Sequence, residues 1–152
     1  VKDMRRGVDF LVSHPEIDAS RLAYTGHSFG ALVGGVLAGV EKRIRAFVLM
    51  AGTGSFMDVV SLNMPFLEGP ALERYAQVIA PIDPVHYIAH AAPSELFFQF
   101  GRQDDFTQDQ FERFAQAASE PKVVKWYDTD HYFQIDEAQE DRLDWLQTRL
   151  RK

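Results

Sequence analysis

The feature that most constrains this fold is a short turn that joins a predicted strand directly to a predicted helix. Residues 22–25 (Leu-Ala-Tyr-Thr) have the composition of a strand, and residues 26–30 form a tight connection bounded by glycines. A helix is predicted to follow, because apolar residues recur there at helical spacing: Val33, Val36, Leu37 and Val40. A strand that passes straight into a helix is the building unit of an alternating α/β fold.

The rest of the chain repeats this alternation. A continuous apolar run at 46–51 indicates a strand that is covered on both faces, as in a parallel sheet. Further strands are predicted at 95–100 and 123–127, and further helices at 4–12, 71–78, 111–118 and from about 137 to the C-terminal end. We therefore expect a three-layer α/β/α domain with a mainly parallel sheet of about four strands and right-handed crossovers.

Composition excludes several kinds of partner and site. A net charge of −6, with scattered Lys and Arg residues, argues against a nucleic-acid or anionic-membrane surface. No apolar run has the length of a membrane span. The chain has no cysteine, which excludes thiolate metal sites and slightly favours the cytoplasm without deciding the localisation. His86 and His90 are spaced as two ligands on one helix face, but no third ligand is evident, so we predict no metal site.

The turn itself carries the pattern G-x-S-x-G, as Gly26-His27-Ser28-Phe29-Gly30. Between a strand and a helix, this pattern is typical of a nucleophile elbow, in which the serine adopts strained dihedrals and projects above the sheet at a helix N-terminus. The N–H of Phe29, the residue after the nucleophile, would then be one oxyanion-hole donor. The alternative is a glycine-rich turn with an incidental serine.

A serine hydroxyl needs a base to take its proton and a carboxylate to orient that base. Candidate residues follow two other predicted strands. Asp104 and Asp105 come after the strand at 95–100, and His131 comes after the strand at 123–127. Because sites in parallel sheets form at the carboxyl ends of the strands, Ser28, an aspartate and His131 are predicted to meet there.

The segment 15–30 resembles the approach to the nucleophile in α/β-hydrolases of the dienelactone-hydrolase and prolyl-oligopeptidase groups. The segments 100–104 (Phe-Gly-Arg-Gln-Asp) and 131–133 (His-Tyr-Phe) resemble the same groups, so the likeness covers nearly the whole chain outside residues 53–92.

In those groups the acid lies three residues after the glycine that closes the strand, so the resemblance assigns the acid to Asp104. Asp105 is the main alternative acid. Asp58 is a more distant alternative, because some members take the acid from the loop after the second strand, here the strand predicted at 46–51. Asp130 stands where these relatives often have Gly or Ala. Its carboxylate would lie near the imidazole or point to solvent.

The resemblance implies a serine hydrolase that cleaves a small-molecule carboxylic ester through an acyl-enzyme intermediate, with Ser28, Asp104 and His131 as its triad and no cofactor. A peptidase or amidase of the prolyl-oligopeptidase type is one alternative. A non-catalytic binding module on the same fold is another, although such a module need not keep an intact Ser-Asp-His set. Fold alone does not fix the substrate.

This fold commonly inserts a lid over the serine where the chain has the less regular segment 53–92, so that segment is predicted to be a lid or insertion region. Several apolar residues there would line an acyl or leaving-group pocket or pack in the core. His27, in the elbow, would pack beside it rather than act as a base. The pocket candidates are His27, Phe56, Met57, Met64 and Phe66.

The resembled fold begins with strands that precede the helix predicted at 4–12, and a loop among them supplies the second oxyanion N–H. No segment of this chain provides that loop. We therefore expect residues 1–152 to be a single, partial domain, the C-terminal half of the fold. The strand at 22–25 would be an uncovered sheet edge, which favours self-association, and this half alone would be poorly active without the second donor.

Overall fold

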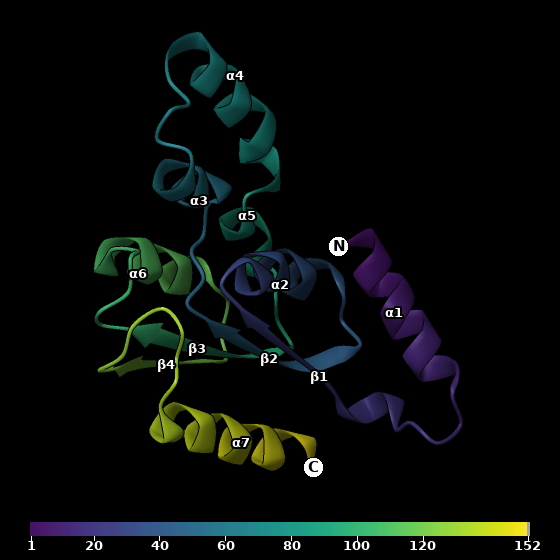
Figure 1. Ribbon diagram of the computed structural model, residues 1–152. Coiled ribbons are helices and arrows are strands. Elements are labelled where there is room, and N and C mark those ends of the chain that lie inside the picture. The colour runs from purple at the N-terminus through teal and green to yellow at the C-terminus, as the bar shows by residue number, and fades with distance from the viewer. Residues whose placement is uncertain (152) are drawn as a thin grey trace.

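The computed structural model describes residues 1–151 (Figure 1). Its helices and strands, with two short 3-10 turns at Ala19–Arg21 and Ala80–Ile82, are α1 (Lys2–Ser13), β1 (Leu22–His27), α2 (Phe29–Val40), β2 (Ile44–Met50), α3 (Phe56–Asn63), α4 (Gly69–Ile79), α5 (Pro84–Ile88), β3 (Glu95–Gly101), α6 (Gln108–Ala117), β4 (Lys122–Tyr127) and α7 (Asp136–Leu150). No helix within this part of the chain combines the length and the apolar character that are needed to cross a bilayer.

The strands form one parallel sheet, as the alternation predicted, and their order in it is β1-β2-β3-β4. The register aligns the carboxyl ends of the strands, because His27 pairs with Met50 and Gly101 pairs with Tyr127. The segments that follow all four strands therefore emerge at one edge of the sheet.

Alternating side chains of the central strands pack against two layers of helices. Phe47 and Leu49 of β2 lie in the larger core cluster, together with buried residues of α1, α2, α5 and α6. Ala46 and Val48 point to the other face and pack against Trp145 of α7. Figure 1 shows α7 alone on that side of the sheet. The three-layer arrangement predicted from the sequence is confirmed.

The segment between β2 and β3 holds α3, α4 and α5, of which the sequence predicted one helix, corresponding to α4. Figure 1 shows α3 and α4 standing out from the body on the side of the sheet that carries α2. The two ends of this excursion meet: Val85 N donates to Gly54 O at 3.1 Å, and Asp83 accepts from Ser55 Oγ at 2.7 Å and from Phe56 N at 2.8 Å. Asp83 is buried, so this neck is a fixed part of the structure.

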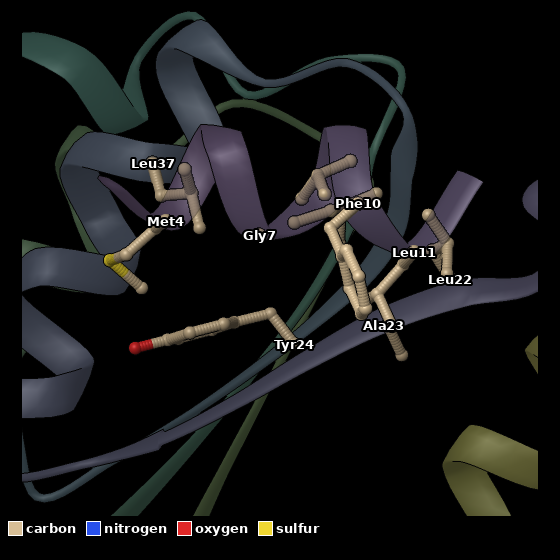
Figure 2. Close-up of a pocket in the computed structure, with 10 residues that line it drawn as sticks. Met4, Gly7, Phe10, Leu11, Leu22, Ala23, Tyr24 and Leu37 are labelled. Carbon is tan, nitrogen blue, oxygen red and sulfur yellow. The ribbon is translucent and has the colours of Figure 1, made fainter. Parts of the chain in front are cut away.

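Within the described residues, β1 pairs with β2 only and is an edge of the sheet. Beside it lies an apolar groove of about 420 Å³ between α1 and β1. Figure 2 shows apolar side chains of α1 facing β1 across this groove, with Met4 over Tyr24 and Phe10 extending towards Ala23. Phe10 is largely exposed. The edge strand and the groove together present unpaired backbone groups next to apolar surface.

We predict that the 152-residue chain on its own self-associates through β1, because an edge strand without charged residues is a template for pairing. Thr25→Lys places a charge on this edge and should shift the chain towards monomer in size-exclusion chromatography with light scattering over a range of concentrations. Gln116→Lys adds the same charge at an exposed position on α6 and serves as the control. A chain that is monomeric at all concentrations, or equal effects of the two variants, would contradict the prediction.

Candidate active site

Ser28 sits on a strained turn between β1 and α2. Its backbone has φ 54° and ψ −119°, an unfavourable combination for a residue with a side chain. Ser28 N donates to Met50 O at 2.8 Å, so the turn is tied to the end of the neighbouring strand. A Cβ on Gly26 would lie 2.4 Å from Gly30 O, which explains the first glycine of the pattern. A Cβ on Gly30 would meet its nearest atom at 3.7 Å, so the second glycine is not required by crowding.

Phe29 begins α2, so its N–H is among the first amides of the helix and has no carbonyl partner within it. Its ring is exposed and lies 5.9 Å from the ring of Phe56 at the start of α3. The predicted oxyanion donor therefore has a free backbone N–H beside Ser28.

The loops after β3 and β4 approach each other closely. A Cβ on Gly101 would lie 2.6 Å from Thr129 O, so only glycine fits where the two loops meet. Gln103 N donates to Thr129 O at 3.1 Å, and Gln103 Nε2 donates to Asp128 Oδ1 at 2.7 Å. These contacts bring the loop that carries Asp104 beside the loop that carries His131.

A chain of hydrogen bonds joins the three residues that the sequence singled out. His131 Nε2 lies 2.9 Å from Ser28 Oγ, and His131 Nδ1 lies 3.0 Å from both carboxylate oxygens of Asp104. The Asp104 side chain is fully buried, whereas that of His131 is 21% exposed. Phe106 N also donates to Asp104 Oδ1, at 3.0 Å, and fixes the carboxylate. A buried carboxylate that accepts from an imidazole can stabilise the protonated ring.

The other carboxylates occupy different positions. Asp105 is exposed and lines the pocket beside Ser28. Asp58, on α3, lies 3.9 Å from the guanidinium of Arg113. Asp130 is exposed and accepts from Tyr132 N at 2.9 Å, so its carboxylate caps the turn after His131. Asp104 is the candidate acid within hydrogen-bond distance of the imidazole.

A pocket of about 220 Å³ opens beside Ser28. It is lined by Ser28, Phe29, Val59, Leu62, Asn63, Asp105, Phe106, His131 and Tyr132. Among the described residues, this lining includes α3 residues that the sequence did not single out and none of the five pocket candidates.

The predicted pocket residues lie outside this lining. The helix α3 begins at Phe56 and turns Val59, Leu62 and Asn63 towards Ser28 instead. Phe56 and Met57 are half-buried in its first turn, and Phe56 packs on Phe29. Met64 and Phe66 lie beyond its end, and Phe66 is 80% exposed. The available sequence signal for Val59 and Leu62 is their spacing of three residues, which places them on one side of a helix.

His27 contacts the histidine loop from the elbow. Its Nε2 lies 2.6 Å from His131 O, and its ring lies 5.0 Å from the His131 ring and 6.4 Å from that of Phe133. The sequence placed His27 beside the elbow, and in this position it holds the main chain of His131 rather than lining the pocket.

We predict that His27→Phe lowers kcat towards an ester by about fivefold, because a net contribution of about 1 kcal/mol from the bond to His131 O would be lost. His27→Gln should retain more activity, since its amide can also donate to that carbonyl. His14→Phe, at the end of α1, is the matched control. Steady-state kinetics of the three variants measure these effects. Equal kcat for His27→Phe and the parent protein would show that the bond from His27 to His131 O does not contribute to activity.

A buried polar network supports the same loop from the other side. Gln99 is fully buried and its Nε2 donates to Tyr127 Oη and to Ala138 O, each at 2.8 Å. Burial raises the pKa of Tyr127, so its hydroxyl stays protonated and donates to Asp141 Oδ2 at 2.9 Å. The ion pair with Lys125, at 2.7 Å, lowers the pKa of Asp141. This network ties β3, β4 and α7 together on both sides of the loop that carries His131.

Nearly the whole chain is similar in sequence to known proteins. A family model described as BAAT / Acyl-CoA thioester hydrolase C terminal matches residues 4–144. Two uncharacterized proteins of Mycobacterium tuberculosis, from strains CDC 1551 / Oshkosh and ATCC 25618 / H37Rv, are each 30% identical to this chain over 128 residues. The matched part is 79% of this chain and 41% of each relative, so the chain spans less than half the length of these curated relatives.

Solved structures share the fold at low sequence identity. The 2,6-dihydroxy-pseudo-oxynicotine hydrolase has a TM-score of 0.80 at 18% identity, over 98% of this chain and 46% of its own. The acetyl xylan esterase of Paenibacillus sp. R4 has a TM-score of 0.75 at 19% identity, over 97% of this chain and 51% of its own. An acylaminoacyl peptidase has a TM-score of 0.80 at 15% identity, over 99% of this chain and 27% of its own. These likenesses show an α/β-hydrolase fold.

Proposed function

This chain belongs to the BAAT / Acyl-CoA thioester hydrolase C terminal family, and from that premise we propose that it is a serine hydrolase that cleaves a carboxylic ester. The observation that carries the proposal is the continuous set of hydrogen bonds from Asp104 through His131 to Ser28. A hydroxyl at 2.9 Å from an imidazole that is itself oriented by a buried carboxylate has the arrangement of an activated nucleophile.

In the proposed reaction Ser28 Oγ attacks the carbonyl carbon of the ester while His131 Nε2 takes the hydroxyl proton. The Phe29 N–H donates to the oxyanion, and Asp104 stabilises the imidazolium. The bond to the leaving group breaks as His131 returns the proton to the departing oxygen, which leaves an ester between the acyl group and Ser28. Water then attacks the carbonyl carbon of this acyl-enzyme while His131 takes its proton. The bond to Ser28 Oγ breaks as His131 gives that proton to Oγ, which releases the carboxylic acid and restores the serine.

A thioester is a second candidate substrate, because the family description names acyl-CoA thioester hydrolysis. The two substrates share the acyl-enzyme and differ in the leaving atom, since a thiolate leaves with less need for a proton than an alkoxide does. A peptidase or amidase remains the third candidate, and it would depend most strongly on protonation of the leaving nitrogen by His131.

A fluorophosphonate probe tests the proposal without assuming a substrate. We expect the probe to label the full-length gene product at Ser28, as located by mass spectrometry of the labelled peptide. Aryl ester, acyl thioester and peptide anilide substrates then rank the three candidates by kcat/KM. Failure of the folded protein to react with the probe would contradict an activated Ser28, and with it the proposal, and would favour the alternative of a non-catalytic binding module.

A further inference from the structure

The pocket beside Ser28 has two different sides. The His131 ring contacts the rings of Phe106 and Tyr132, with centroid distances of 5.9 Å and 6.1 Å. The other side is formed by α3, whose first residue, Phe56, packs on Phe29 next to the nucleophile. A substrate that spans this pocket therefore contacts aromatic rings at the histidine and a helix at the other end.

The chemistry of the proposed reaction assigns the two parts of the substrate to these sides. His131 must deliver its proton to the leaving group, so the leaving group lies beside His131 and the two rings that contact it. The acyl group extends from the same carbonyl carbon in the other direction, towards Phe29 and α3. The face of α3 that lines the pocket is thus the surface that an acyl group would meet.

This face of α3 is apolar. Val59 and Leu62 are three residues apart and share one side of the helix. The amide of Asn63, which also lines the pocket, donates to Val59 O at 2.9 Å and is engaged with the helix backbone. No charged residue of α3 lines the pocket among the described residues, since Asp58 is directed to Arg113 instead.

The α3 wall of the pocket is fixed. The described residues enclose a volume of about 220 Å³ beside Ser28. Val60 is buried, and Asp83 holds the start of α3 through Ser55 and Phe56. Of the two lining side chains, Val59 is half-buried and Leu62 is 45% exposed, so Leu62 stands at the outer end of the apolar wall.

We propose that α3 forms the acyl subsite and that Leu62 sets the length of the acyl group which the enzyme accepts. This inference rests on the proposed hydrolase function and adds a specificity determinant to it. A short acyl group fits between Phe29 and Leu62, whereas a longer one meets the Leu62 side chain.

The test is an acyl series with one leaving group, the p-nitrophenyl esters of acetate, butyrate and octanoate, measured with the full-length gene product. Leu62→Ala should raise the ratio of kcat/KM for octanoate to that for acetate about tenfold or more, since one methylene in an apolar pocket changes this quantity by about 10–200-fold. Leu62→Trp should lower the ratio for butyrate to acetate by a similar factor. Leu143→Ala is the matched control, because Leu143 of α7 is 48% exposed and remote from the pocket.

Ratios of kcat/KM do not depend on the fraction of folded enzyme, so a destabilised variant still reports specificity. Unchanged ratios in both Leu62 variants, in an enzyme that hydrolyses the esters and reacts with a fluorophosphonate, would overturn the inference and leave the proposed function intact. A parent protein that neither reacts nor hydrolyses would overturn the proposed function instead. A response to acetates of different alcohols, with no response to acyl length, would show that α3 faces the leaving group and would also overturn the inference.

Discussion

Ser28→Ala will lower kcat for a short-chain aryl ester by about 10⁴-fold or more in the full-length gene product, because nucleophile and base act as a unit. The substitution removes Ser28 Oγ, which lies 2.9 Å from His131 Nε2. Initial rates with p-nitrophenyl acetate, together with circular dichroism to verify the fold, measure this effect.

Ser13→Ala is the matched control for that loss, because the Ser13 hydroxyl donates to Phe10 O at the exposed end of α1. Its activity should equal that of the parent protein. If Ser28→Ala were as active as the parent protein, another residue would be the nucleophile, and the strained backbone at Ser28 would not serve catalysis.

Asp104→Asn should lower kcat by about 10²–10⁴-fold, whereas Asp105→Asn should cost little. The Asp104 carboxylate is fully buried and lies 3.0 Å from His131 Nδ1, and an amide there would favour the wrong tautomer of the ring. Asp105 is exposed and makes no such contact.

The same kinetic assay applied to both variants separates the two neighbours. If Asp105→Asn is the damaging change, Asp104 is not the group that orients His131 in solution. If both variants keep full activity, the imidazole needs no carboxylate partner, and the proposed mechanism loses one of its three residues.

The local parts of this fold could be predicted from the sequence because each is encoded within a few neighbouring residues. The strand, turn and helix around Ser28 follow from apolar spacing and the glycine pattern, and β1, α2 and the parallel sheet are where the sequence placed them. The choice of Asp104 over Asp105 comes from the family resemblance, through the offset from Gly101, and the structure has Asp104 Oδ1 3.0 Å from His131 Nδ1.

The walls of the pocket could not be predicted, because they depend on contacts distant in sequence. Asp83 sets the face of α3 that turns towards Ser28. It accepts hydrogen bonds from Ser55 and Phe56 at the start of α3, although it lies near the C-terminal end of the segment between β2 and β3. Met64 and Phe66 are pocket candidates by sequence because they are apolar and fall where the resembled fold commonly inserts a lid. Both lie beyond the end of α3, outside the set of residues that lines the pocket beside Ser28. The buried hydrogen bonds of Gln99 could not be predicted for the same reason. Gln99 lies in an apolar run, and its partners belong to β4 and α7.

The neck formed by Gly54, Asp83 and Val85 affects which insertions and deletions the fold can accept during evolution. Because both ends of residues 55–83 are held at one point of the body, insertions and deletions between them leave β2, β3 and the loops after them in place, and lengthening a surface excursion costs little free energy. Residues 55–83 can therefore change in length and sequence without displacing Ser28, Asp104 or His131, which lie outside this segment.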